Sequence, residues 1–295
     1  MKIRNVEAFK VKVPVREDAV YSKEYLVGEE VPPFYEIPKY VFRLYTDDGL
    51  VGVGESYRGV SLESVEDGMR SVKDVEIDGL NLRDLPINTE VYVGFETAIF
   101  DVVGKLYGVP AYKLLGGTYR KGVYVSFWTS RRTPEDLAER AEVARRGGFD
   151  GMKIKCKLGD PMVERLEAVE EAVGPEFYVV LDPNERFYNP AETIKLMRKL
   201  EKYNIPILES PVPQWNLDWY VLLRRKINVP LAIHVSQRGP REAYGMHQTI
   251  EAIKKGAIDY LNVSAGLVDF TKIAAIAEAA GIQGKNSPKT WASRP

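Results

Sequence analysis

The chain is poor in the side chains that form disulfides or bind soft metals. Its 295 residues include one cysteine, Cys156, and two histidines, His234 and His247. A single cysteine excludes both an internal disulfide framework and a cysteine-based zinc site. It also fits a reducing compartment, so the expected localisation is cytoplasmic.

The chain also lacks a charge of one sign and a long apolar run. Its 41 basic and 42 acidic residues leave a net charge of −1, so we expect neither nucleic acid nor a membrane surface as partner. The first residues, Met1 to Val13, contain no signal-peptide core and no span of about 20 apolar residues. A small molecule is therefore the expected partner.

The first 120 residues predict an α+β domain. Strand spacing over 2–13 and 39–46, with a turn at 47–49, predicts a small antiparallel sheet, and helical spacing follows over 61–75 and 88–107. Residues 14–38 are rich in Pro, Glu and Tyr and are too long for a simple hairpin connection. Connections of this length often act as lids over a site.

From residue 123 onwards, short apolar strands alternate with amphipathic helices, which is typical of a parallel sheet. Thr133, Asp160, Asn189 and Asn216 are expected to begin helices, as caps or in the first turn. The expected strands are 123–128, 151–157, 177–182, 205–209, 230–234 and 260–264. Their near-constant spacing predicts a (β/α) barrel, which needs roughly 250 residues when complete. Residues 121–284 would therefore form an incomplete barrel.

The last residues, 285–295, have no strand alternation and no apolar run. One interpretation is an ordinary flexible terminus. Our preferred hypothesis is that the chain leaves its ancestral frame or is cut short near Gly284, so that one or two strand–helix units are absent. Strand edges exposed in this way would favour association, and we expect a homo-oligomer.

Three lysines lie at strand spacing within one predicted strand. Lys153, Lys155 and Lys157 alternate with Ile154 and Cys156, so the lysines share one face and Cys156 packs on the other. In a barrel the lysine face is the interior, where ammonium groups need carboxylates or an anionic substrate nearby. A solvated edge of lysines is the alternative interpretation.

The next two predicted strands end in carboxylates. Asp182 begins the sequence D-P-N-E, and Glu209 begins E-S-P-V-P. Both would lie at the C-terminal rim, where barrel active sites are found. Two carboxylates that converge there need a cation between them, and hard oxygen ligands suit Mg²⁺ or Mn²⁺. Helix-capping acids are the structural alternative.

These motifs, with G-M-K-I-K-C-K on the preceding strand, resemble the enolase superfamily in its mandelate racemase and muconate lactonizing branch. The similarity extends over nearly the whole chain, including G-E-S-Y at 54–57. It implies a capping domain whose long loop, here 14–38, closes over a (β/α)7β barrel and shapes substrate choice. It also implies Mg²⁺ held by acids at three strand ends, and abstraction of a proton α to a carboxylate.

The resemblance implies roles for individual residues. Lys155 would be the catalytic base and Lys153 would assist it, while Asp182 and Glu209 would bind the metal. The residues expected to contact the substrate are Asn184, Lys157, Tyr57, Asn262 and Ser264.

The chain departs from the family pattern at its fifth and sixth barrel strands. The fifth reads P-L-A-I-H-V-S, which places His234 or Val235 where the family usually has an acid. His234 could be the third metal ligand, an acid or base, or a rim residue without a role. The sixth has Asn262 and Ser264 near the position of the family's opposite-face base, which disfavours two-base racemisation.

Three hypotheses follow. The first is a Mg²⁺-dependent lyase or isomerase (dehydratase, racemase, epimerase or cycloisomerase) acting on a hydroxy-, sugar- or amino-acid-like carboxylate. The second is an inactive truncated barrel with residual metal or carboxylate binding. The third is a metal-free aldolase that forms a Schiff base through Lys155.

Overall fold

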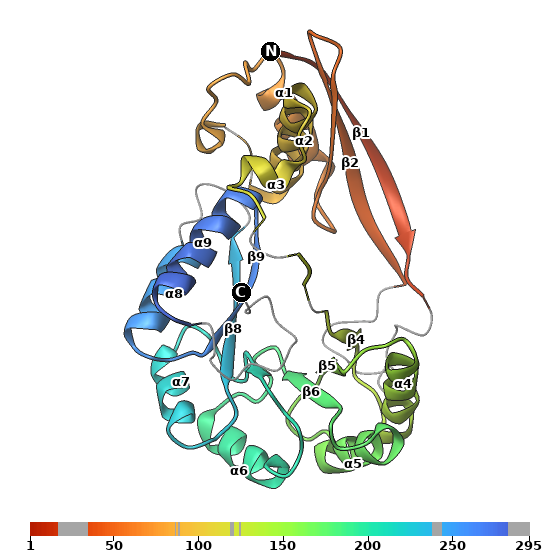
Figure 1. The fold of residues 1–295 in the computed structure, drawn as a ribbon, viewed down its shortest axis with the longest axis vertical. Helices are drawn as coiled ribbons and strands as arrows, with labels where there is room; N and C mark the ends of the chain where they lie inside the picture. The colour runs from red at the N-terminus through yellow and green to blue at the C-terminus, as the bar shows by residue number, and fades with distance from the viewer. Residues whose placement is uncertain are drawn as a thin grey trace.

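The computed structural model describes residues 1–16, 35–85, 87, 89–118, 121–123, 125–237 and 244–282. The predicted tail at 285–295 lies outside these residues, as does most of the long connection at 14–38. The described chain has an antiparallel sheet with its helices at one end and a curved parallel sheet at the other (Figure 1). No helix within the described residues is both long and apolar enough to span a membrane.

The N-terminal sheet has the order β1(Ile3–Pro14), β2(Glu36–Thr46) and β3(Val51–Glu55). Both β1 and β2 extend further than predicted, because Pro14 still pairs with Glu36. The helices of this part are α1(Leu62–Val72), η3(Leu82–Asp84), α2(Thr89–Tyr107) and α3(Ala111–Leu114).

Helix α2 packs closely on this sheet. The Phe42 and Phe95 rings stack with centroids 4.4 Å apart. A Cβ added at Gly54 would lie 2.0 Å from the Gly94 carbonyl oxygen, so glycine is required where the backbones of β3 and α2 meet. The predicted α+β character of this part of the chain is therefore confirmed.

The second sheet is parallel, with its strands in chain order from β4 to β9. The strands are β4(Phe127–Thr129), β5(Gly151–Lys155), β6(Tyr178–Asp182), β7(Leu208–Glu209), β8(Leu231–Gln237) and β9(Tyr260–Ala265). The helices are α4(Pro134–Arg146), α5(Met162–Val173), α6(Pro190–Leu200), α7(Leu217–Arg224), α8(Tyr244–Lys254) and α9(Leu267–Ala279). They lie outside the curve of the sheet (Figure 1), which gives a half-barrel.

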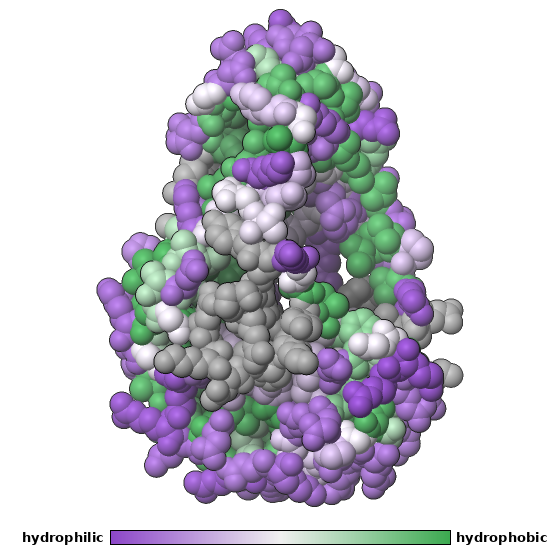
Figure 2. Space-filling view, viewed as in Figure 1, coloured by the Kyte–Doolittle hydropathy of each residue, from purple (hydrophilic) through white to green (hydrophobic). Residues whose placement is uncertain are grey.

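The two faces of the half-barrel have different neighbours. The outward residues of β5, Met152 and Ile154, are buried in the large core shared with the helices, as is Cys156 just after the strand. The inward face holds a small buried cluster of Tyr178, Val180, Ile207, Ala232 and Tyr260. The solvent side of the helices, along the lower edge of Figure 2, is mostly hydrophilic. Alternation along each strand therefore decides which side chains face the interior.

Three of the four residues predicted to begin helices occupy N-cap positions, and two of these three cap through the side chain. Thr133 Oγ1 accepts a hydrogen bond from Asp136 N at 3.3 Å, and Asn189 Oδ1 accepts one from Glu192 N at 3.0 Å. Asn216 is the N-cap of α7, but its side chain makes no cap bond. The prediction for Asp160 is wrong, because Pro161 occupies the N-cap position of α5 and the Asp160 carboxylate binds two arginines instead.

Candidate active site

Strand β5 directs two lysines into the half-barrel. Lys153 and Lys155 lie on the inward face, with side chains 14% and 19% exposed. Met152 and Ile154 alternate with them and are buried against the helices. This alternation leaves the two ammonium groups on the side of the sheet where the neighbouring strands end in acids.

The carboxylates of β6 and β7 meet these lysines. Lys153 Nζ lies 2.8 Å from Asp182 Oδ2 and 2.7 Å from Glu209 Oε2. Lys155 Nζ lies 2.5 Å from the same Asp182 oxygen. Both carboxylates have only 1% of the side chain exposed. We call these four residues the lysine–carboxylate cluster, and three adjacent strands bring them together.

The charges in this cluster stabilise one another. Burial alone would lower the pKa of Lys153, but the adjacent Asp182 and Glu209 outweigh it and the pKa is raised. Burial would raise the pKa of Asp182, but Lys155 and Lys153 outweigh it and that pKa is lowered. Lys153 is therefore an ammonium and Asp182 a carboxylate at neutral pH.

Two amides extend the cluster. The Asn184 side-chain oxygen accepts a hydrogen bond from Lys155, and its main-chain N–H donates to Asp182 Oδ1 at 3.2 Å. Asn262, on β9, donates from Nδ2 to Glu209 Oε1 at 2.7 Å. Strand β9 and the loop after β6 therefore also contribute hydrogen bonds to the cluster.

His234 lies on β8, between β7 and β9 in the sheet. Its Nε2 lies 2.8 Å from Ser264 Oγ. Burial lowers the pKa of His234, and the nearby Glu209 only partly offsets that effect. The imidazole is therefore neutral at pH 7 and can accept a proton or offer a nitrogen lone pair.

Lys157 and Tyr57 make main-chain hydrogen bonds outside the cluster. Strand β5 ends at Lys155, so strand alternation no longer fixes the direction of Lys157, whose main-chain N–H donates to Asp160 Oδ2 at 3.0 Å. Tyr57 follows β3 in the N-terminal part, where its carbonyl accepts a hydrogen bond from Ser56 Oγ at 2.7 Å. Their roles in substrate binding stay predictions.

The donor atoms of the cluster suit a hard divalent cation only in part. The oxygens of Asp182 and Glu209 already converge on one positive group, the Lys153 ammonium, and carboxylate oxygens are the preferred ligands of Mg²⁺. In the part of the chain that the structure describes, however, no group of three or more His, Cys, Asp and Glu side chains could hold a metal ion. Asp182 and Glu209 fit the role of ligands, and the role of His234 stays a prediction.

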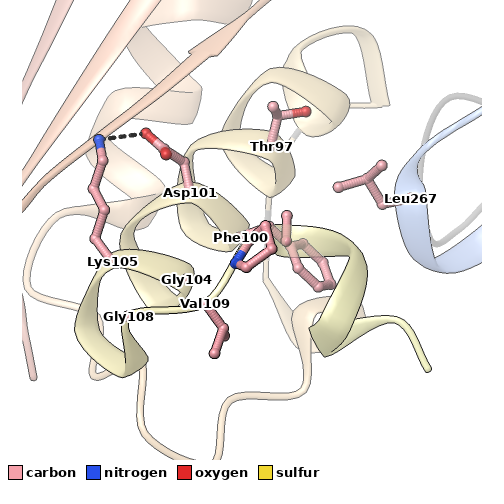
Figure 3. A pocket seen from close by; sticks show the side chains of 10 residues that line it. Thr97, Phe100, Asp101, Gly104, Lys105, Gly108, Val109 and Leu267 are labelled. Atoms are coloured by element: carbon pink, nitrogen blue, oxygen red, sulfur yellow. Dashed lines mark hydrogen bonds and ion pairs between the residues drawn. The ribbon is translucent and has the colours of Figure 1, made fainter. Parts of the chain in front are cut away.

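A separate pocket of about 400 Å³ lies between α2, the segment that follows it and Leu267 of α9 (Figure 3). Its polar side chains Asp101 and Lys105 pair with each other at 2.8 Å. They also bind the main chain of β3, at Val53 N and Val51 O. The pocket contains no member of the lysine–carboxylate cluster, so it is not the candidate active site.

One residue that organises the ends of these strands has no recognisable sequence pattern. Gln214 follows the E-S-P-V-P motif, and its side chain binds both main-chain groups of His234. Glutamine is common on protein surfaces, and only the positions of β7 and β8 in space reveal this contact.

Comparison with known proteins gives consistent results. A family model described as enolase C-terminal domain-like matches residues 136–291, which contain the whole lysine–carboxylate cluster. The N-succinyl-L-Arg/Lys racemase of Bacillus cereus is 29% identical to this chain, over 96% of the chain and 79% of the racemase. The arabinonate dehydratase of Saccharolobus solfataricus is 30% identical, over 64% of the chain and 51% of the dehydratase.

Among solved structures, the dipeptide epimerase of Enterococcus faecalis V583 has a similar fold. That structure is a complex with Mg and the dipeptide L-Leu-L-Tyr. The TM-score is 0.80 at 23% identity, and the match covers 95% of this chain and 80% of the epimerase. The fold similarity therefore includes both the antiparallel sheet and the half-barrel.

Proposed function

This chain belongs to the enolase superfamily, in its mandelate racemase and muconate lactonizing branch, and on that premise we propose that it abstracts a proton α to a substrate carboxylate. The observation that carries the proposal is the lysine–carboxylate cluster, with two ammonium groups and two buried carboxylates within hydrogen-bond distance. The relatives with curated functions include racemases, epimerases and dehydratases, which agrees with this class of reaction.

The two lysines would have different roles. Lys153 contacts both carboxylates, which keep it protonated, so it suits binding and neutralising the substrate carboxylate. Lys155 contacts Asp182 alone among the acids of the cluster and is more exposed, so Lys155 Nζ would first lose a proton to solvent and then, as the neutral amine, accept the α-proton. Asn184, which binds Lys155 through its side chain, would hold the lysine in position.

Asp182 and Glu209 would hold Mg²⁺, or Mn²⁺ in its place. When bound, the cation supplies positive charge that stabilises the enediolate as the α-proton leaves. A divalent cation would also balance the charges of the site, since the substrate adds a carboxylate to the two already present. The described residues supply these two acids for it, and His234 is our candidate for a third ligand or for an acid–base group.

We further propose that the reaction uses one base. The face opposite the lysines presents Asn262, Ser264 and His234. Asn262 and Ser264 cannot act as bases near neutral pH, so with His234 as the third metal ligand this face would hold no second base. Racemisation by two bases needs a proton acceptor on each side of the α-carbon. A dehydration or another one-base reaction of a hydroxy-, sugar- or amino-acid-like carboxylate therefore fits this site better. The half-barrel would be part of the family's (β/α)7β barrel, and the N-terminal part would be its capping domain.

Solvent deuterium exchange tests this function. Candidate acids would be incubated in D₂O with Mg²⁺ or Mn²⁺, and incorporation at the α-carbon followed by NMR. We expect Lys155→Ala to lower the exchange rate by about 10²- to 10⁴-fold, the usual contribution of a general base, and chelation with EDTA to abolish exchange. Lys202→Ala, which removes an exposed lysine paired with Glu167, is the matched control.

Two results would contradict the proposal. If Lys155→Ala exchanges as fast as the Lys202→Ala control, Lys155 is not the base. If borohydride traps a covalent adduct on Lys155 in the presence of EDTA, the reaction is a metal-free Schiff-base reaction instead.

A further inference from the structure

Strand β7 is too short to pair fully with β8. It consists of Leu208 and Glu209 only, and Ser210 leaves the strand with a φ of 46°. The last ladder bond on this side runs from Ser210 N to Ala232 O at 2.9 Å. The main-chain N–H and C=O of His234, two residues further along β8, therefore face a position where β7 no longer supplies a backbone partner.

The side chain of Gln214 occupies that position. Its Oε1 accepts a hydrogen bond from His234 N at 2.6 Å, and its Nε2 donates to His234 O at 3.1 Å. A carboxamide carries the same donor and acceptor as a peptide group. Gln214 thus replaces one missing rung of the ladder and satisfies two main-chain groups that would be costly to leave unpaired.

Gln214 also binds the loops that follow the two carboxylate strands. Its Oε1 accepts a second hydrogen bond, from Ser210 Oγ at 2.9 Å, and its main-chain N–H donates to Glu185 Oε1 at 3.2 Å. Ser210 and Glu185 both have positive φ angles, of 46° and 67°. Non-glycine residues keep this conformation only where their surroundings hold them in it.

We propose that Gln214 is a positioning residue that fixes the ends of β6, β7 and β8 relative to one another, and so places His234 against Ser264 and opposite the lysine–carboxylate cluster. Only a side chain with both a donor and an acceptor can hold the His234 main chain in this way. Glutamate lacks the donor, and asparagine is shorter by one methylene. The catalytic consequence rests on the function proposed above, whereas the structural consequence does not.

The test compares Gln214→Met, which keeps the length of the side chain but loses both hydrogen bonds, with Gln214→Glu, which loses the donor. Gln248→Met is the matched control, because Gln248 Nε2 contacts the carbonyl of Gln214 at 3.5 Å and not His234. Wild-type protein and variants would first be compared by circular dichroism and thermal melting. If Gln214→Met does not fold, Gln214→Glu carries the test.

Two readouts separate positioning from general stability. For α-proton exchange, we expect Gln214→Met to lower kcat by about 10- to 100-fold, with KM little changed. Losses of this size are usual for residues that hold active-site residues in position without contacting the substrate. For the imidazole, ¹H–¹⁵N NMR distinguishes His234 from the exposed His247, the only other histidine. We expect the His234 resonances to move in both Gln214 variants and those of His247 to stay.

The proposal is overturned if the His234 resonances in both Gln214 variants match those of the Gln248→Met control. It is also overturned if kcat falls no further in Gln214→Met than in that control. Should the wild-type protein exchange no α-proton at all, the proposed function fails while the NMR comparison still decides the role of Gln214.

Discussion

Asp160 illustrates how a single residue supports the candidate active site from outside it. Its carboxylate accepts hydrogen bonds from Arg131 Nε at 3.1 Å, Arg165 Nη1 at 2.6 Å and Lys157 N at 3.0 Å. Only 2% of the Asp160 side chain is exposed. The residue therefore joins the loop after β4, the end of β5 and helix α5 around one buried negative charge.

We expect Asp160→Asn to lower the free energy of unfolding by about 3–5 kcal/mol, because removing one partner of a buried ion pair leaves the other charge uncompensated. Denaturant titration would measure the change. Asp218→Asn is the control, since the Asp218 side chain is 75% exposed and its pair with Lys255 is open to solvent. An equal loss of unfolding free energy in both variants would show that the buried ion pairs of Asp160 contribute no more to stability than an exposed pair.

The same residue predicts a pH dependence. Burial would raise the pKa of Asp160, but its hydrogen bond to Arg131 and the charge of Arg165 outweigh it, so the pKa is lowered from 3.8. When the pKa of a carboxyl group is lower in the folded state than in the unfolded state, its ionisation stabilises the fold at pH values above the unfolded-state pKa. This stabilisation is lost as the pH falls through the folded-state pKa. The difference in the free energy of unfolding between wild type and Asp160→Asn should therefore be constant above pH 3.8 and decrease below it.

At the scale of helices and strands, the regular part of the fold could be predicted from the sequence. The alternation of Lys153, Lys155 and their apolar neighbours placed the lysines on the inward face, and the acids that end apolar runs placed Asp182 and Glu209 beside them. These predictions succeed because strand period and the common edge of parallel strands are local rules.

The predictions that failed concern residues whose partners are distant in the sequence. Asp160 has the sequence signature of a helix cap but binds Arg131, 29 residues earlier. Gln214, for which no prediction was made, binds His234, 20 residues later, and shows no local pattern at all. Strand β7 was predicted over 205–209 but extends only over Leu208–Glu209. Such features depend on which loops meet in space, and local sequence patterns do not show which loops meet.

Helix α6 offers a test of the local rules. Asn189 Oδ1 accepts a hydrogen bond from Glu192 N at 3.0 Å, and Pro190 follows at the first helical position. We expect Asn189→Ala to lower the free energy of unfolding by about 1 kcal/mol, the usual value for a lost N-cap, whereas Asn189→Ser should restore most of it. If alanine and serine are equally destabilising, the effect does not come from the cap.

At the scale of the whole molecule, a buried carboxylate joins the N-terminal part to the half-barrel. Glu96, on α2, is buried and accepts hydrogen bonds from Leu267 N at 2.6 Å and Val268 N at 3.2 Å. These N–H groups begin helix α9, whose own N-cap, Gly266, has no side chain to bind them. A Cβ at Gly266 would lie 2.2 Å from Glu96 Oε2, so the contact also explains the glycine.

The burial of Glu96 gives this contact a pH dependence of opposite sign to that of Asp160. Burial raises the pKa of Glu96, with a smaller contribution from Asp269, and the N–H groups of Val268 and Leu267 oppose the rise only in part. Because the pKa of Glu96 is higher in the folded state, its contribution to the free energy of unfolding is fully present below the unfolded-state pKa of about 4.5. That contribution is lost as the pH rises through the folded-state pKa.

We therefore expect the stability of wild type, relative to Glu96→Gln, to decline in denaturant titrations as the pH rises above 4.5. Glutamine keeps the size of the side chain and one acceptor oxygen but cannot ionise. Glu63→Gln, at an exposed position in the first turn of α1, is the matched control and should show no such trend.

Gly266→Ala should displace Glu96 from α9, so its effect and that of Glu96→Gln should not add. Additive losses would mean that the carboxylate does not hold the two parts together through this helix end.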